Sequence, residues 1–229
     1  MNKYELYKLK VAGLSNEQVF RIVSYWEMNG DWPDLEQIAQ LAGCRNQALF
    51  IERYIRIDDQ ILREEFKEFD SISIMDEEYP EELLWMHNPP VLLFYEGNID
   101  LLKHPKIAVV GSRRCSRTGI HSVEKIINEL NNELVVVSGL AKGIDAASHY
   151  AAIRNGGKTI GVIGTGLDVY YPRCNKQLQK HMSERYLVLT EYGPGQGPQK
   201  HHFPERNRII DGLSRGVIVA EARMRSGSL

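Results

Sequence analysis

The stretch Lys106-Ile107-Ala108-Val109-Val110-Gly111-Ser112-Arg113-Arg114-Cys115-Ser116 decides the fold of this chain. It begins as a short apolar run with the length and composition of a buried strand, and it ends in a polar turn that contains glycine. A helical pattern over residues 116–132 follows at once. A buried strand that turns directly into a helix is the first half of a βαβ unit. We therefore predict a parallel sheet.

The same alternation continues to residue 219. The predicted strands are 106–110, 134–137, 158–163, 186–190 and 216–219, and the predicted helices between them are 116–132, 145–155, 174–184 and 204–215. Strands that are apolar almost throughout indicate a sheet covered on both faces. We predict an α/β fold with an extended, Rossmann-like, doubly wound and mostly parallel sheet.

The residues before this alternation follow another pattern. Helical spacing predicts helices over 4–10, 16–28, 34–41 and 46–67, with Ser15 and Asn46 as N-caps. Strands over 71–74 and 90–95, with a short helix over 80–86 between them, lead into the alternating part. We predict two domains, a small all-helical one over 1–67 and an α/β one over 68–229. The Gly13-Leu14-Ser15 turn could touch a DNA backbone, but its acidic surroundings favour packing or a protein contact.

Composition excludes several classes of protein. The chain has 229 residues, of which 43% are hydrophobic and 25% charged, as in globular rather than disordered proteins. Its apolar runs are far shorter than the ~20 residues that cross a bilayer, and its first residues lack a signal-peptide core. We expect a cytoplasmic protein with no membrane partner. The three cysteines form no C-x-x-C pair, so neither a disulfide framework nor a thiolate zinc site is indicated.

Charge is divided unevenly along the chain. Residues 1–104 contain 10 Lys+Arg and 20 Asp+Glu, a net charge of −10, whereas residues 105–229 contain 18 and 10, a net charge of +8. Such asymmetry suggests an anionic partner for the second part of the chain.

The turn after the first regular strand has the features of an anion site. Gly111 permits close approach, Ser112 and Ser116 can donate hydroxyl protons, and Arg113 or Arg114 can bind phosphate oxygens in a bidentate way. The helix that follows would add free N–H groups and the positive end of its dipole. The alternative is a serine-capped helix with two solvated arginines.

Further polar turns follow the next strands. Ser138 to Asp145 is glycine-rich and contains Lys142 and Gly143, and Gly164 to Asp168 is followed by Tyr170, Tyr171 and Arg173. The basic block from Lys200 to Arg208 leads into the next helix. Turns after parallel strands meet at one edge of the sheet, where such folds bind ligands. Cations and aromatic rings together favour single-stranded nucleic acid. We interpret Asp145 as a helix cap rather than a base.

Several chemistries are not supported by the sequence. A phosphate-binding P-loop motif and a G-x-G-x-x-G dinucleotide motif are both missing. Adjacent His201 and His202, without a spaced third ligand, favour hydrogen bonding over a metal site. The pairs Asp58-Asp59 and Glu77-Glu78 are interpreted as solvated acidic faces. We expect no metal and no cofactor.

Taken together, these motifs resemble the bacterial DNA-processing protein A family (DprA, also called Smf). The resemblance rests on Gly111-Ser112-Arg113 with Ser116, on residues 138–145, on 164–168 with Tyr171-Pro172, on 203–214, and on 219–222 with 225–229. It covers about residues 69–229, and the helical front end resembles the sterile-alpha-motif-like domain of streptococcal members.

The resemblance implies a function and a set of binding residues. Family members are cytoplasmic homodimers that bind single-stranded DNA during natural transformation, protect it and load the RecA recombinase onto it, without catalytic turnover. Arg113 is implied as the main DNA contact, and Arg206, Asn207 and Arg208 either contact DNA or brace the pocket. The remaining residues implied at the DNA site are Gly111, Ser112, Ser116, Lys142, Gly143, Arg173 and Lys200, with Phe203 as a base-stacking ring.

The end of the chain and a rival function bear on what the resemblance implies. Family members continue through another helix and strands that supply dimer and RecA contacts, so a chain that ends at Leu229 is expected to keep DNA binding better than dimerisation or RecA loading. A rival function is a Rossmann-fold enzyme that hydrolyses nucleoside monophosphates. Its P-G-G-x-G-T-x-x-E loop is only partly matched here by Gly193 to Gly197.

Overall fold

A computed structural model describes residues 2–130 and 132–222. The chain divides into two compact units, the first made of Met1–Tyr79 and Met86–Leu93 and the second of Pro80–Trp85 and Phe94–Leu229. The first unit thus extends beyond the predicted helical domain. In the described part of the chain, no helix is both long and apolar enough to span a membrane. The end of the family motif, residues 225–229, lies outside the described residues.

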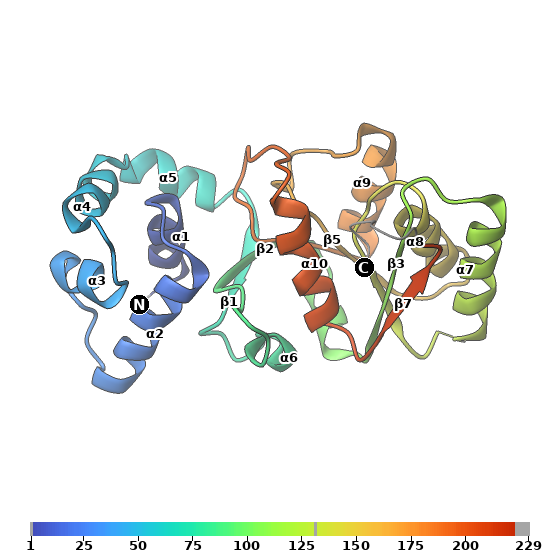
Figure 1. Ribbon diagram of the computed structural model, residues 1–229, viewed down its shortest axis with the longest axis horizontal. Coiled ribbons are helices and arrows are strands. Elements are labelled where there is room, and N and C mark those ends of the chain that lie inside the picture. Colours follow the sequence, from blue (N-terminus) through green and yellow to red (C-terminus); the bar gives the residue numbers. More distant parts are fainter. Residues whose placement is uncertain (1, 131, 223–229) are drawn as a thin grey trace. The chain divides into compact units, whose positions relative to one another are not determined.

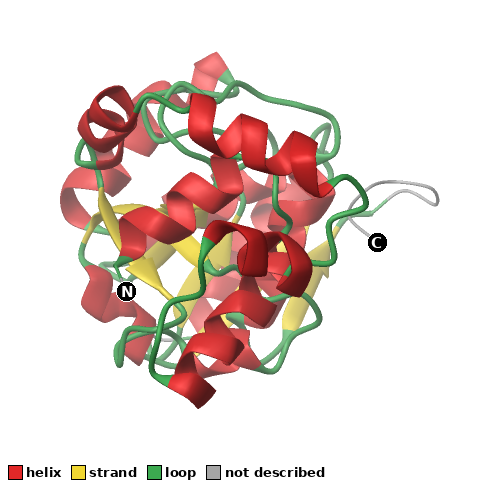
Figure 2. Cartoon of the chain, turned by 90° about the vertical axis from the view of Figure 1, so that its left-hand side faces the viewer, coloured by secondary structure: helices red, strands yellow, loops and turns green. Residues whose placement is uncertain are grey.

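The N-terminal part is all helical up to the first strand (Figures 1 and 2). Its helices are α1 (Lys3–Val11), α2 (Asn16–Asn29), α3 (Leu35–Leu41), α4 (Gln47–Arg56) and α5 (Asp59–Phe66). Leu6, Leu9, Val19 and Ile22 are fully buried and form part of its core. The predicted caps are confirmed, because the Ser15 side chain accepts a bond from the Gln18 N–H and Asn46 from the Leu49 N–H.

The single long helix predicted over 46–67 is wrong. Ile57 has an extended backbone, and Asp58 begins a new helix by accepting bonds from the N–H groups of Gln60 and Ile61. Nor is Asp59 merely a solvated carboxylate, since its Oδ1 lies 2.9 Å from the Lys8 ammonium. The Asp58 carboxylate accepts hydrogen bonds from N–H groups that would bond to backbone carbonyls in an unbroken helix. A capping side chain of this kind therefore favours the end of one helix and the start of the next.

The second part of the chain is built on a sheet with the strand order β1-β2-β6-β5-β4-β3-β7. The strands are β1 (Asp70–Ser73), β2 (Leu92–Gly97), β3 (Lys106–Gly111), β4 (Val135–Ser138), β5 (Thr159–Val162), β6 (Leu187–Thr190) and β7 (Val217–Ala220). Strands β3 to β7 are parallel to one another, whereas β2 runs antiparallel to β6. The predicted α/β class and mostly parallel sheet are confirmed.

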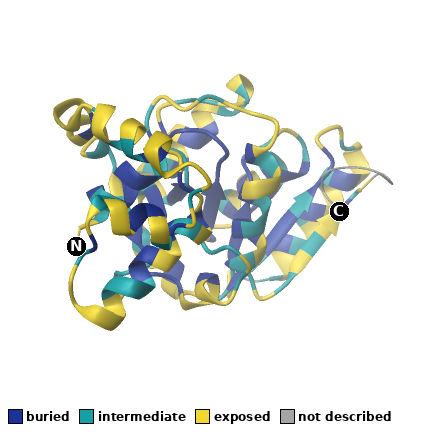
Figure 3. Cartoon of the chain, turned by 60° about the vertical axis from the view of Figure 1, so that its left-hand side comes forward, coloured by how far each residue is buried: buried dark blue, intermediate teal, exposed yellow. Residues whose placement is uncertain are grey.

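Helices cover both faces of this sheet, as predicted. Figure 1 shows α10 (His202–Gly212) in front of the strands, with α8 (Ile144–Arg154) and α9 (Lys176–Arg185) behind them. The remaining helices are α6 (Glu81–Leu84), α7 (Arg117–Glu129) and the short 3₁₀ helices η1 (Ile99–Lys103) and η2 (Arg173–Asn175). Buried residues, dark blue in Figure 3, follow the central strands, and every residue of β4, β5 and β6 is buried.

The chain order along the sheet reverses between β3 and β7. Strands β3 to β6 run in sequence towards one side, and α10 then carries the chain back over the sheet to β7 on the other side of β3. In open α/β sheets, ligands bind in the crevice at the carboxyl ends of the strands where the order reverses. The sheet therefore places the turn after β3 at the position where a binding site is expected.

Candidate nucleic-acid interface

A cleft of about 1070 Å³ lies between α10 and strands β3 and β7 and extends to the turn after β3. Val110, Ile210 and Val217 line its apolar part. Most predicted site residues line the cleft as well, namely Gly111, Ser112, Arg113, Lys200, Phe203, Arg206, Asn207 and Arg208. The tertiary structure thus brings together residues that are up to 97 positions apart in the sequence, from Gly111 to Arg208.

A smaller cavity of about 270 Å³ shares several walls with the cleft. Arg113, Tyr171, Phe203 and Arg206 line both, and Lys142 lines the smaller one. The other three predicted residues line neither cavity. Ser116 caps α7, Gly143 precedes α8, and Arg173 lies exposed at the start of η2.

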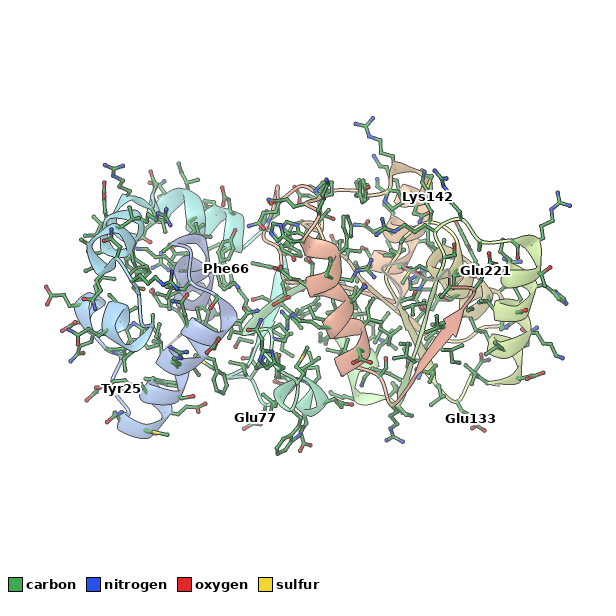
Figure 4. All side chains as sticks on the ribbon, in the orientation of Figure 1. Tyr25, Phe66, Glu77, Glu133, Lys142 and Glu221 are labelled. Atoms are coloured by element: carbon green, nitrogen blue, oxygen red, sulfur yellow. The ribbon has the colours of Figure 1, made fainter. Side chains whose placement is uncertain are left out.

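Cationic and aromatic side chains meet at the mouth of the cleft. The Arg113 guanidinium lies 5.1 Å from the centroid of the Phe203 ring, and that ring lies 5.6 Å from the ring of Tyr171. Arg113, Lys142 and Lys200 are exposed, and Figure 4 shows Lys142 on the side of the sheet towards which β3 runs. Exposed cations can bind phosphate oxygens, and an aromatic ring beside them can stack on a base.

Backbone N–H groups of the turn after β3 donate hydrogen bonds to Glu221, near the end of the described chain. The Ser112 N–H donates to the Glu221 carbonyl oxygen at 2.9 Å, and the Ser116 N–H donates to the Glu221 carboxylate at 2.8 Å. The Ser116 hydroxyl donates to the same carboxylate at 2.8 Å. The N–H and the hydroxyl of Ser116, the N-cap of α7, therefore already hold an anion, the carboxylate of Glu221, which Figure 4 labels.

Two of the predicted glycines are needed for close backbone packing. A β-carbon at Gly111 would overlap the carbonyl oxygen of Ala220, and one at Gly143 would overlap the carbonyl oxygen of Ser112. Gly143 also has a φ of +80°, which disfavours other residues. Ser112 is buried, and its hydroxyl accepts the Arg114 N–H at 3.1 Å. These residues shape the turn that displays Arg113.

A buried ion pair lies beneath the cleft. Arg206 is 4% exposed, and its Nη1 lies 3.8 Å from Asp145 Oδ2, while Asp145 is 5% exposed. The predicted capping role of Asp145 is wrong. Gly143 is the N-cap of α8, and Asp145 faces Arg206 from the first turn of that helix. Burial raises the pKa of Asp145, and Arg206 opposes that shift. Arg206 therefore braces the floor of the cleft.

The remaining basic and histidine residues of α10 are also held in place. Arg208 forms an ion pair with Glu191, and Asn207 lines the cleft beside it. The His202 ring stacks on Tyr192 with centroids 3.8 Å apart, and its Nδ1 lies 3.0 Å from the Gly164 carbonyl oxygen. Burial lowers the pKa of His202. Within residues 2–130 and 132–222, no group of three His, Cys, Asp or Glu side chains could hold a metal ion.

Sequence reasoning missed the partners of these residues. The sequence shows Glu221 only as part of a family motif, and nothing in it pairs Glu221 with Ser116, 105 positions earlier. Asp145 and Arg206 are likewise distant in sequence and meet only across the sheet edge. A signal was available for Asp145, because a carboxylate in the first turn of a helix and inside an apolar segment needs a buried partner.

Comparison with known proteins gives matches over almost the whole chain. Residues 70–229 match a family model described as DNA recombination-mediator protein A, and residues 1–62 match one described as the DNA processing protein A sterile alpha motif domain. DNA processing protein DprA of Streptococcus pneumoniae is 60% identical over 229 residues, which cover all of this chain and 81% of that protein. The Bacillus subtilis protein of the same name is 46% identical, over 69% of this chain and 54% of its own length.

Solved structures agree with these matches. The X-ray structure of DNA processing protein A from Streptococcus pneumoniae superposes with a TM-score of 0.98 over all of this chain and 81% of that one. A structure of DNA processing protein A from Helicobacter pylori, described by its single-stranded DNA binding mode, has a TM-score of 0.63 at 32% identity, over 70% of this chain and 74% of its own.

Proposed function

The chain belongs to the DNA recombination-mediator protein A family, and we propose that it binds single-stranded DNA in the cleft under α10 and hands it to the RecA recombinase during natural transformation. The observation that carries the proposal is the stack of the Arg113 guanidinium on Phe203 at the mouth of the cleft. The relative from Helicobacter pylori, described as binding single-stranded DNA, supports the class of ligand. The family's description as a recombination mediator supports the transfer to a recombinase.

The cationic and aromatic residues divide the work of binding. Arg113, Lys142 and Lys200 neutralise phosphates, and Phe203 stacks on a base. Phosphate contacts and stacking do not read sequence, so binding is largely independent of base order. Gly111, Ser112, Ser116 and Gly143 shape the turns, while Arg206, Asn207 and Arg208 build the wall behind them, and Arg173 extends the basic surface.

The protein acts as a binding protein rather than as an enzyme in this proposal, and as a cytoplasmic homodimer with a separate helical domain over residues 1–67. Buried carboxylates beside the cleft are engaged by arginines, Asp145 by Arg206 and Glu191 by Arg208. Burial behind these arginines leaves neither carboxylate the access to a substrate proton that a general base needs. Incubation with nucleoside monophosphates should therefore release no base.

The test is binding of a fluorescent oligo-dT measured by anisotropy over a range of salt concentrations. The logarithm of the affinity should fall with the logarithm of the salt concentration by about 0.7 per phosphate neutralised. Arg113→Ala should weaken binding at least tenfold and reduce that slope by about 0.7. Arg117→Ala is the matched control, because Arg117 is exposed near the same turn but lines neither cavity. An Arg113→Ala slope equal to that of the parent would exclude Arg113 as a phosphate contact.

A further inference from the structure

We propose that single-stranded DNA continues from the cleft onto the outer face of α9, where Lys176, Lys180 and Tyr170 form a second phosphate-binding site. This inference rests on the proposed function, because it extends the same DNA path. It assigns a role to residues that neither the cleft nor the smaller cavity contains.

Two ammonium groups converge on one aromatic ring at this site. Lys176 Nζ lies 4.7 Å from the centroid of the Tyr170 ring, and Lys180 Nζ lies 5.7 Å from it. The two lysines are one helical turn apart, so they project from the same face of α9. The opposite face of the helix is buried through Leu178 and Met182. The lysines therefore form a fixed pair of positive charges at the surface.

Neither charge is neutralised within the part of the chain that the structure describes. Lys176 and Lys180 form no ion pair there, whereas exposed lysines elsewhere do, such as Lys103 with Asp100 at 2.6 Å and Lys125 with Glu129 at 3.9 Å. Attraction to the Tyr170 ring limits the freedom of both side chains without consuming their charge. A polyanion can therefore bind them at a lower cost in side-chain entropy.

The site is joined to the cleft by a rigid connection. Tyr170 precedes Tyr171, which lines both the cleft and the smaller cavity. The Asn175 side chain donates to the carbonyl oxygens of Leu140 at 2.8 Å and Ala141 at 3.0 Å, which fastens η2 to the loop that carries Lys142. Exposed Arg173 lies on the same short helix. A phosphate chain bound at Lys142 thus has a cationic route over η2 to α9.

A strand long enough to reach α9 is needed to test this route. Oligo-dT of about 6 and about 20 nucleotides would be compared, since single-strand sites span about 4–16 nucleotides. The variant Lys176→Ala/Lys180→Ala should bind the long oligonucleotide roughly tenfold more weakly, with a salt slope lower by about 1.4, and the short one as the parent does. Lys103→Ala/Lys125→Ala removes the same charge elsewhere and should change neither. Circular dichroism would confirm that all variants fold.

The other results each have a defined meaning. Long-oligonucleotide binding that is unchanged in Lys176→Ala/Lys180→Ala overturns the inference, and so does an equal loss in the control variant, which would indicate only a net-charge effect. A parent protein that binds neither oligonucleotide overturns the proposed function and the inference with it. Tyr170→Leu should weaken binding of the long oligonucleotide two- to threefold without changing the salt slope, because it frees the lysines without removing their charge.

Discussion

A buried cation lies at each end of the parallel strands, one at their amino ends and one beside their carboxyl ends. The two cations differ greatly in how completely their hydrogen-bonding groups and charge are paired. At the amino end of β3, Lys106 is 1% exposed and donates to the carbonyl oxygens of Leu102 at 2.6 Å and His104 at 3.0 Å. Its ammonium also lies 3.1 Å from Glu82. Beside the carboxyl edge, Arg206 has Asp145 at 3.8 Å, and its Nε has no hydrogen-bond partner among the described residues.

We attribute the difference between Lys106 and Arg206 to different roles: Lys106 stabilises the fold, and Arg206 belongs to the candidate binding site. Buried polar groups normally find partners, and Lys106 follows that rule. Incompletely compensated charge is typical of binding sites, where the surroundings are arranged for a ligand rather than for the folded state alone. The amino edge thus holds α6 and η1 to β3, while the carboxyl edge keeps positive charge beside a cleft.

The largest effect on stability should come from removing the hydrogen bonds and the ion pair of Lys106. Lys106→Ala leaves two carbonyl oxygens and Glu82 without their donor, and it should lower the free energy of unfolding by about 3–5 kcal/mol. Urea unfolding measures this loss. Lys103→Ala, which removes an exposed ion pair, should cost less than about 1 kcal/mol. Similar small losses for both variants would show that Lys106 is not the anchor of the amino edge.

At the other edge, Gly139→Ala should displace Arg206. A β-carbon at Gly139 would overlap the Arg206 guanidinium, whereas one at Gly164 would meet only His202 atoms at 3.4 Å, an ordinary contact. We expect Gly139→Ala to cost about 1–3 kcal/mol of stability through overpacking and to weaken oligo-dT binding, because Arg206 braces the cleft. Because Gly164 lines the smaller cavity, the control is Gly216→Ala, whose β-carbon would meet only the Ile107 side chain at 3.5 Å and which lines neither cavity. Normal DNA binding by a folded Gly139→Ala protein would show that the position of Arg206 is unimportant.

A buried histidine behind the carboxyl edge should make stability depend on pH. His149 is fully buried, and its Nδ1 lies 2.7 Å from the Thr159 hydroxyl oxygen, which itself donates to Val136. Burial and the Arg206 charge lower the pKa of His149 to about 3. In the unfolded chain the pKa of this histidine is near 6.5, so there the imidazole binds a proton that it does not bind in the folded protein. The free energy of unfolding therefore falls as the pH drops below about 6.5.

The size of this effect can be isolated with a variant. Between pH 7.5 and 5 the parent should lose roughly 2 kcal/mol more stability than His149→Gln, which has no proton to bind. Urea unfolding at both pH values gives the difference. An identical pH dependence in the two proteins would mean that His149 is protonated in the folded state as readily as in the unfolded chain.

The smallest effect is expected at Glu221. Glu221→Gln keeps an acceptor for the Ser116 N–H but removes the negative charge at the start of α7, so stability should fall by less than about 1 kcal/mol. The salt slope of oligo-dT binding should stay unchanged, because in the proposed binding mode side chains rather than the start of α7 bind phosphates. A slope steeper by about 0.7 would instead indicate that a phosphate had taken the place of the carboxylate.

The sequence alone determined the α/β class, the parallel strands and the edge of the sheet at which the candidate site residues gather. Each of these depends on local signals, such as the apolar run over residues 106–110 and the glycine-containing turns behind each strand. Such signals act over a few residues and survive without knowledge of the fold. The family motifs also pointed to Arg113 and Phe203, which the structure places 5.1 Å apart.

Only the tertiary structure decided which groups remain free to bind a ligand. The N–H of Ser116 belongs to a helix start that favours any anion, and it is Glu221, far along the chain, that takes this place. Asp145 similarly became the partner of Arg206 rather than a cap. Hydrogen bonding and charge pairing depend on distance in space, and residues more than 50 positions apart meet only when the strands take their order in the sheet. For this reason the residue types of the site could be predicted from sequence, but their roles could not.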